Sequence, residues 1–210
     1  MKNLPVFITE NGVASIELKQ VPAWKTAYIT IQNSPQANAL LDECAGFCKS
    51  AGAENVYACG HSILESYPVY TQVWEMTGRA FCNPCHNVSL KSVGNEDEEL
   101  FRGIYNRKMS GVPVAKYLEP RDISRYRECG YFVYEGSQLI GICILEGNKI
   151  CAIASLVKGG GEKVISAISS RLNGKNFVVE VASANEKAVN LYTRLGLEKS
   201  KVLNTWYKIL

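Results

Sequence analysis

Several features that would point to a special environment or partner are scarce in this chain of 210 residues. Its formal net charge is only +3 and the basic residues are dispersed, which does not favour nucleic acid or an anionic membrane as partner. The longest apolar runs, Leu139 to Leu145 and Ile150 to Leu156, have strand length and are too short to span a membrane. The first ten residues lack the apolar core of a secretory signal. We therefore expect a cytoplasmic protein with neither a nucleic-acid nor a membrane partner.

Low-complexity segments and short repeats are also missing, and the hydrophobic fraction of 47% is ordinary for a globular protein. A chain of this length can bury a sizeable core and could hold one large domain or two small ones. Cysteine, by contrast, is plentiful at eight residues. At this size and without an export signal, reduced thiols are expected. We expect four of them to pack as small hydrophobic side chains, namely Cys44 and Cys48 on a predicted helix and Cys143 and Cys151 in apolar strands.

Two further cysteines lie in the segment Cys82-Asn83-Pro84-Cys85-His86. This spacing could chelate zinc, attach a haem or form a redox pair. Zinc would need two more ligands, for which Cys59 and His61 are the available residues. Haem attachment would need export, and a redox pair would open a helix, whereas residues 87–90 read as extended. The favoured interpretation is two unbonded thiols in a linker without metal, with a zinc site as the alternative.

The most informative segment runs from Asn185 to Leu197 and follows the apolar, β-branched run 177–182. Its apolar residues recur at spacings of three and four and share one helix face: Ala188, Leu191, Tyr192 and Leu195. Asn185 can cap the first turn with its side chain, and Gly196 can adopt the left-handed conformation that ends a helix. The pattern alone therefore predicts a strand followed by a helix.

The rest of the chain from about residue 87 can also be read as a series of elements. Turn residues between apolar runs predict an antiparallel meander of three strands, and a glycine cluster opens the helix that follows it. The predicted elements are a strand at 88–91, helices at 97–109 and 122–129, strands at 131–134, 139–145 and 150–157, a helix after the glycine cluster at 159–161 with Val164, Ile165, Ile168 and Leu172 on one face, the strand and helix just described, and a final strand pair at 199–203 and 205–210.

The segment Asn185 to Leu197, read as N-x-x-A-x-x-L-Y-x-x-L-G-L, resembles the fourth conserved segment of the GNAT superfamily of acyl-CoA-dependent N-acyltransferases. The element order from Val88 to Leu210 is also the order expected of that fold, and motif and order are independent features that agree. The resemblance implies an α/β fold with a mixed sheet. It places a GNAT N-acetyltransferase domain at 87–210 and a smaller N-terminal α/β domain, packed on it, at 1–86.

The N-terminal domain is predicted to contain a strand at 26–31, a helix at 35–51 and a strand at 55–59. This unit resembles the middle of a GNAT domain. The loop before the helix, 32–35, has no glycine that would let backbone approach a phosphate. We therefore expect a degenerate, non-catalytic half-domain, with 78–87 as the connecting segment.

The resemblance implies acetyl-CoA as co-substrate, and the glycines Gly159, Gly160 and Gly161 are the candidates for holding its pyrophosphate. A helix N-terminus entered through glycines offers unpaired N–H groups and a favourable dipole, and Lys158 and Lys163 flank it. A plain turn is the alternative. The family pattern is Q/R-x-x-G-x-G/A, whereas here Leu156 stands at the Gln/Arg position and the loop is short.

The remaining site residues follow from the resemblance as well. Backbone groups of the strand before the glycines would hold the pantetheine arm and point an N–H at the oxyanion: Ala154, Ser155, Leu156 and Val157. Asn185 would touch the pantetheine, or only cap its helix. Tyr192 would act as general acid toward the thiolate, since a phenol is protonated at neutral pH, or would only pack in the core. No general base is evident: Glu146 lies at a turn, and Glu180 is expected to be solvated.

The leading hypothesis is thus an N-acetyltransferase acting on a primary amine of a small molecule or peptide. A GNAT-fold binding or sensing protein without transfer chemistry is the alternative, and an interaction protein organised by zinc is a third. The sequence leaves open whether the chain forms a homodimer.

Overall fold

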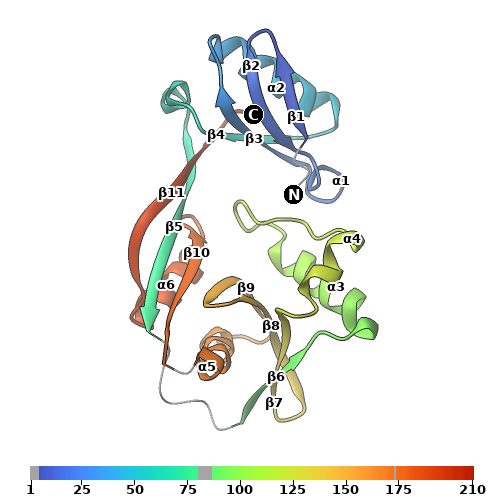
Figure 1. Cartoon of the computed structure of the whole chain (residues 1–210), viewed down its shortest axis with the longest axis vertical. Helices are drawn as coiled ribbons and strands as arrows, with labels where there is room; N and C mark the ends of the chain where they lie inside the picture. The colour runs from blue at the N-terminus through green and yellow to red at the C-terminus, as the bar shows by residue number, and fades with distance from the viewer. Residues whose placement is uncertain (1–4, 80–86, 173) are drawn as a thin grey trace. The chain divides into compact units, whose positions relative to one another are not determined.

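Two β-sheet units make up the structure, a computed structural model that describes residues 5–79, 87–172 and 174–210 (Figure 1). The first unit takes Met1–Val73 together with Val202–Leu210, and the second takes Trp74–Lys201. Strands β5 (Val69–Arg79) and β11 (Glu198–Lys208) each run through a boundary between the units. The division therefore differs from the expected boundary at 86/87. Residues 202–210 belong to the first unit because the end of β11 pairs with β4, where Tyr207 lies opposite Ala58.

The first unit is a mixed sheet on which α2 is the longest helix among the described residues, with the strand order β1-β2-β3-β4-β11. Its elements are β1 (Val6–Thr9), β2 (Gly12–Glu17), α1 (Val21–Trp24), β3 (Thr26–Asn33), α2 (Ala37–Ser50), β4 (Asn55–Cys59) and η1 (Ser62–Ser66). Strands β3 and β4 are parallel and α2 connects them, so the predicted strand–helix–strand unit is confirmed. The α2 side chains predicted to face inward are all buried: Leu40, Leu41, Cys44 and Cys48.

The second unit has the strand order β11-β5-β10-β9-β8-β7-β6, with helices between its strands in the chain. Its further elements are β6 (Val88–Ser92), η2 (Asn95–Asp97), α3 (Glu98–Met109), α4 (Pro120–Ile123), η3 (Ser124–Tyr126), β7 (Gly130–Glu135), β8 (Gln138–Glu146), β9 (Lys149–Ser155), α5 (Gly161–Leu172), β10 (Asn176–Ala182) and α6 (Glu186–Arg194). The predicted α/β class, the meander β7-β8-β9 and the order of elements are confirmed. The predicted final strand pair is wrong, because β11 continues through Asn204 as one strand.

The main core of the second unit lies between α5 and the sheet. From α5 the predicted apolar face is buried, namely Val164, Ile165, Ile168 and Leu172, and it meets buried side chains of five strands, among them Met76, Val133, Cys143, Ile150 and Phe177. Cys143 thus packs as a small hydrophobic residue, as predicted. The same prediction for Cys151 is wrong, since this side chain is exposed. Pairing shifts from Ile144 with Ala152 to Leu145 with Ile150, so Cys151 is the extra residue of a β-bulge.

Candidate functional site

Strands β9 and β10 separate soon after they meet, which creates the central feature of the second unit. In the described ladder, Lys149 pairs with Val178 and Ile150 with Val179, and pairing goes no further. Strand β9 nevertheless continues to Ser155, where it remains paired with β8. The backbone of β9 beyond Ile150 therefore faces β10 without ladder bonds, next to the bulge at Cys151. Such unpaired N–H and C=O groups need another partner, and a ligand can supply it.

The glycine loop joins the end of β9 at Ser155 to the start of α5 at Gly161. Gly159 has φ +75°, which is left-handed, and its missing side chain would point into open space. Gly160 is different: a Cβ there would lie 2.6 Å from Val157 Cγ2 and 2.7 Å from Ser155 Oγ. Ser155 Oγ donates a hydrogen bond to the Val157 carbonyl (2.7 Å), which tightens the loop from inside. Conformation thus favours glycine at 159, and lack of space requires it at 160.

The first turn of α5 offers backbone donors to a ligand. The first hydrogen bond into the helix runs from Val164 N–H to the Gly160 carbonyl, so the N–H groups of Gly161, Glu162 and Lys163 have no intrahelical acceptor. The charges around this turn are mixed, however. The Lys163 ammonium forms an ion pair with Glu135 of β7, and Glu162 lies 3.8 Å from the Arg194 guanidinium.

Helix α6 lies directly against this turn. A Cβ on Gly161 would come within 2.8 Å of Leu191 Cδ2, so the two helices approach each other as closely as glycine allows. The Asn185 side chain accepts a hydrogen bond from Ala188 N–H (3.3 Å), which confirms its predicted capping role. Gly196 has φ +80° at the end of the helix, also as predicted. The glycine loop and the helix that carries Tyr192 therefore converge.

Tyr192 is 8% exposed and belongs to the main core cluster of the second unit. Burial raises the pKa of its hydroxyl to about 12. A thiol has an ordinary pKa of about 8.5, so complete proton transfer from this phenol to a thiolate is uphill in the ligand-free protein. Hydrogen-bond donation by the hydroxyl remains available at every physiological pH. The buried position also agrees with the alternative of a core tyrosine, and the catalytic role stays a prediction.

The two carboxylates considered as bases are both engaged in ion pairs. Glu180 of β10 pairs with Lys149 and is half-exposed, so the expectation that it is solvated is confirmed. Glu146, at the end of β8, accepts a hydrogen bond from the Arg125 guanidinium at 3.2 Å.

Of the four residues considered as zinc ligands, the structure describes only Cys59 and His61. Cys82 and Cys85 lie outside the described residues. Cys59 is buried 3.6 Å from Thr30 Oγ1, and His61 Nδ1 accepts a hydrogen bond from Ile63 N–H. Within residues 5–79, 87–172 and 174–210, three or more His, Cys, Asp or Glu side chains nowhere gather as a metal site would require.

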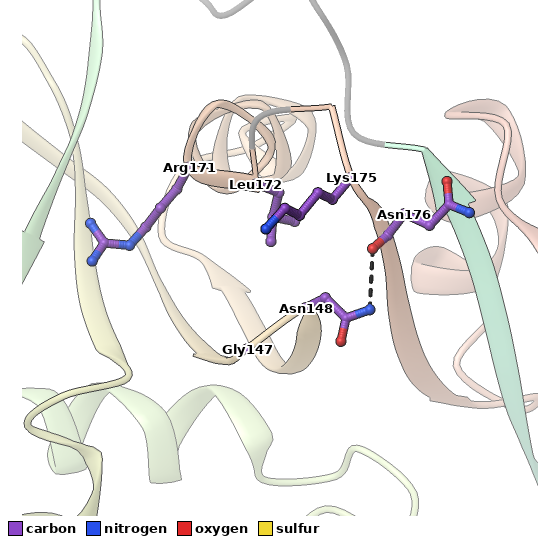
Figure 2. A pocket seen from close by; sticks show the side chains of 6 residues that line it. All are labelled: Gly147, Asn148, Arg171, Leu172, Lys175 and Asn176. Atoms are coloured by element: carbon purple, nitrogen blue, oxygen red, sulfur yellow. Dashed lines mark hydrogen bonds between the residues drawn. The ribbon is translucent and has the colours of Figure 1, made fainter.

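A hollow of about 440 Å³ lies at the other end of α5, away from the glycine loop (Figure 2). It is lined by Gly147, Asn148, Arg171, Leu172, Lys175 and Asn176. Asn148 Nδ2 donates to the Asn176 carbonyl at 3.2 Å across its floor, and the Arg171 side chain extends away from the other labelled residues, with its guanidinium over the Tyr131 ring. None of the site residues predicted from the sequence lines this hollow.

Two contributors to the glycine-loop region escaped the sequence interpretation. The first is Glu135, which neutralises Lys163 from a strand 28 positions earlier in the chain. The second is Ser155 Oγ, which closes the loop through a side-chain hydrogen bond. A serine two residues before the acceptor carbonyl is a common local turn signal and could have been noticed, whereas the Glu135 contact has no local signal.

In the part of the chain that the structure describes, every helix is too short or too polar to traverse a bilayer.

Comparison with known proteins places the fold. No protein-family model matches the sequence, and no curated protein sequence matches it either. Among solved structures, a GCN5-related N-acetyltransferase from Sphaerobacter thermophilus matches with a TM-score of 0.56 and 12% identity, covering 95% of this chain and 76% of that one. A GCN5-related N-acetyltransferase from Kribbella flavida gives a TM-score of 0.59 at 8% identity, over 93% of this chain and 56% of that one.

A conserved protein of unknown function from Staphylococcus epidermidis is similar over 99% of this chain and 94% of its own length, with a TM-score of 0.57 and 11% identity. At these identities the comparisons establish architecture and not chemistry. The chain has the fold of the GNAT acyltransferases, as the motif at Asn185 to Leu197 and the element order predicted.

Proposed function

We propose that the second unit is an N-acyltransferase that moves an acetyl group from acetyl-CoA to a primary amine of a small molecule or peptide. The observation that carries this proposal is the separation of β9 from β10 beyond Ile150, next to a glycine loop at a helix N-terminus, within a GNAT fold. An extended pantetheine arm needs a strand edge with free backbone groups, and β9 has one. A pyrophosphate needs N–H donors at the positive end of a helix dipole, and the first turn of α5 has them.

Each predicted residue then has a physical task. Backbone of the segment Ala154, Ser155, Leu156 and Val157 aligns the thioester through the groups that the fold leaves free, and an N–H of β9 stabilises the oxyanion. The Leu156 N–H is not one of these groups, because it donates to the Ile140 carbonyl at 2.8 Å, and the Val157 carbonyl already accepts from Ser155 Oγ. Gly159, Gly160 and Gly161, with Lys158 beside them, bring backbone close to the phosphates. Tyr192 donates a hydrogen bond to the departing sulfur. The amine needs no dedicated base if it arrives deprotonated, since its proton then leaves to water after attack.

The phosphate subsite fits its proposed ligand only in part. The donors are present, but Leu156 replaces a polar residue of the family pattern, Glu162 adds an anion in the first turn, and Lys163 is neutralised by Glu135. These features favour a low affinity for the cofactor. They also support the second candidate, a GNAT-fold binding or sensing protein that has lost transfer chemistry.

Calorimetry with acetyl-CoA, followed by a screen of amines for release of free thiol, separates the two candidates. We expect binding in the micromolar to millimolar range and thiol release that depends on the amine. Binding without release for any amine would favour the sensing protein. No binding at millimolar acetyl-CoA would reject both forms of the proposed cofactor site.

The place of the phosphates can be tested at Gly159. Aspartate and asparagine both tolerate the left-handed conformation, and neither meets an obstacle there. Gly159→Asp adds a negative charge beside the proposed phosphates, so we expect the Kd for acetyl-CoA to rise about fivefold relative to Gly159→Asn, a Coulomb effect of about 1 kcal/mol. Calorimetry on the two variants at low and high salt measures it. Equal Kd values for both variants would move the phosphates elsewhere.

A second test releases Lys163 from its partner. Glu135→Gln removes the carboxylate that neutralises the ammonium group, so the lysine can turn toward the phosphates. Because exposed ion pairs contribute about 0–1 kcal/mol, we expect acetyl-CoA to bind up to about fivefold more tightly. The gain should vanish in the double variant Glu135→Gln/Lys163→Gln. Weaker binding in the single variant would show that the Glu135 contact supports the loop instead.

A further inference from the structure

Two neighbouring ion pairs lie at the point where β9 and β10 part. Arg125 Nη2 donates to Glu146 Oε1 at 3.2 Å, and Lys149 Nζ pairs with the Glu180 carboxylate. Glu146 and Lys149 are partners in the β8–β9 ladder, so their side chains leave the same face of the sheet and the two pairs adjoin. We call Arg125, Glu146, Lys149 and Glu180 the apex cluster. Its net charge is zero, with two cations and two anions.

The apex cluster borders the proposed crevice. Lys149 belongs to the first of the two β9–β10 residue pairs, and Glu180 is the first residue of β10 beyond the last pair. The corresponding residue on β9 is the bulged and exposed Cys151. Partial burial and the charge of Glu146 raise the pKa of its thiol, and the charge of Lys149 lowers it. An acceptor approaching the strand edge from this face of the sheet therefore passes the cluster.

The ion pairs of the cluster can open at little cost. The four side chains are between 39% and 57% exposed, and exposed pairs of this kind contribute little to stability. Arg125 donates to Glu146 through Nη2, which leaves other guanidinium N–H groups for a ligand. The neighbouring Tyr126 ring lies 5.6 Å from Arg125 Cζ and limits where the guanidinium can go. A guanidinium with donors to spare is suited to a carboxylate, which it can hold by two parallel hydrogen bonds.

We infer that the apex cluster selects a zwitterionic acceptor, an amino acid whose carboxylate binds Arg125 while its amine extends along the unpaired edge of β9 toward the thioester. This inference rests on the proposed function. From Lys149 to the middle of the unpaired edge at Ile153 is four residues, about 13 Å along a strand. The Arg125 side chain spans only part of that length. Amino acids with several methylenes between amine and carboxylate therefore fit, and α-amino acids are too short.

Binding of ε-aminocaproate, n-hexylamine and β-alanine tests the inference, each measured by calorimetry on the full chain. We expect ε-aminocaproate to bind at least about tenfold more tightly than n-hexylamine, because it adds a charge-assisted hydrogen bond, and also more tightly than the shorter β-alanine. Arg125→Gln should abolish the advantage over n-hexylamine. The matched control is Arg121→Gln, which removes an exposed arginine of α4 paired with Glu119 and should leave the advantage intact.

Equal binding of ε-aminocaproate and n-hexylamine to the wild-type protein would overturn the inference, as would an undiminished advantage in Arg125→Gln. Thiol release from acetyl-CoA separates this failure from failure of the proposed function. Transfer to both amines with equal kcat/KM would reject the selectivity and keep the transferase. Arg125-dependent binding without thiol release would keep the selectivity and reject the transferase.

Discussion

Replacing Tyr192 with phenylalanine is expected to lower kcat for acetyl transfer by about a hundredfold, because a positioned proton donor contributes about 10²–10⁴-fold to such a step. The side chain is buried in the main core, on the helix whose Leu191 packs against Gly161, and Phe keeps its volume, so this packing is preserved. Affinity for acetyl-CoA, measured by calorimetry, should change little. The expected signature is a fall in kcat with Kd held constant.

The matched control for this variant is Tyr131→Phe. Tyr131 belongs to the same core cluster, and its hydroxyl donates to the Glu128 carbonyl, so its loss affects stability and not the proposed chemistry. We expect wild-type kcat in Tyr131→Phe. Wild-type kcat in Tyr192→Phe would instead assign Tyr192 to the core alone.

Gly141→Ala is expected to destabilise the second unit by about 1–3 kcal/mol, the usual range for overpacking a filled core. An added Cβ would lie 2.6 Å from Val164 Cγ2 on α5 and 2.7 Å from the Ala154 carbonyl oxygen on β9. The substitution therefore pushes on the helix and on the strand that form the two sides of the glycine loop. Thermal and urea unfolding measure the loss, and acetyl-CoA affinity should fall with it.

Gly103→Ala is the control, because it makes the same substitution at a position where the added Cβ has free space. Gly103 lies within α3 and a Cβ there meets nothing within 4 Å, so removing the glycine should stabilise the helix by about 0.5–1 kcal/mol. Opposite signs at the two positions are the expected result. A neutral or stabilising Gly141→Ala would show that β8, β9 and α5 are packed less tightly than the distances indicate.

The sequence alone determined the features that depend on neighbouring residues. The helix of α6, its cap at Asn185 and its stop at Gly196 follow from one segment of thirteen positions, because hydrogen bonding and apolar spacing within a helix are local. The turns of the β7-β8-β9 meander are equally local. The GNAT architecture itself was predicted from the resemblance of this segment and of the element order to that superfamily.

Only the tertiary structure decided the features that join distant parts of the chain. It placed the end of β11 beside β4, exposed Cys151 through a bulge, and brought Glu135 to Lys163. It also ended the β9–β10 ladder at Ile150 and set the two pairs of the apex cluster side by side. The pairing of strands that lie far apart in the chain depends on which surfaces the whole core buries, and the residues of one segment do not specify the partner.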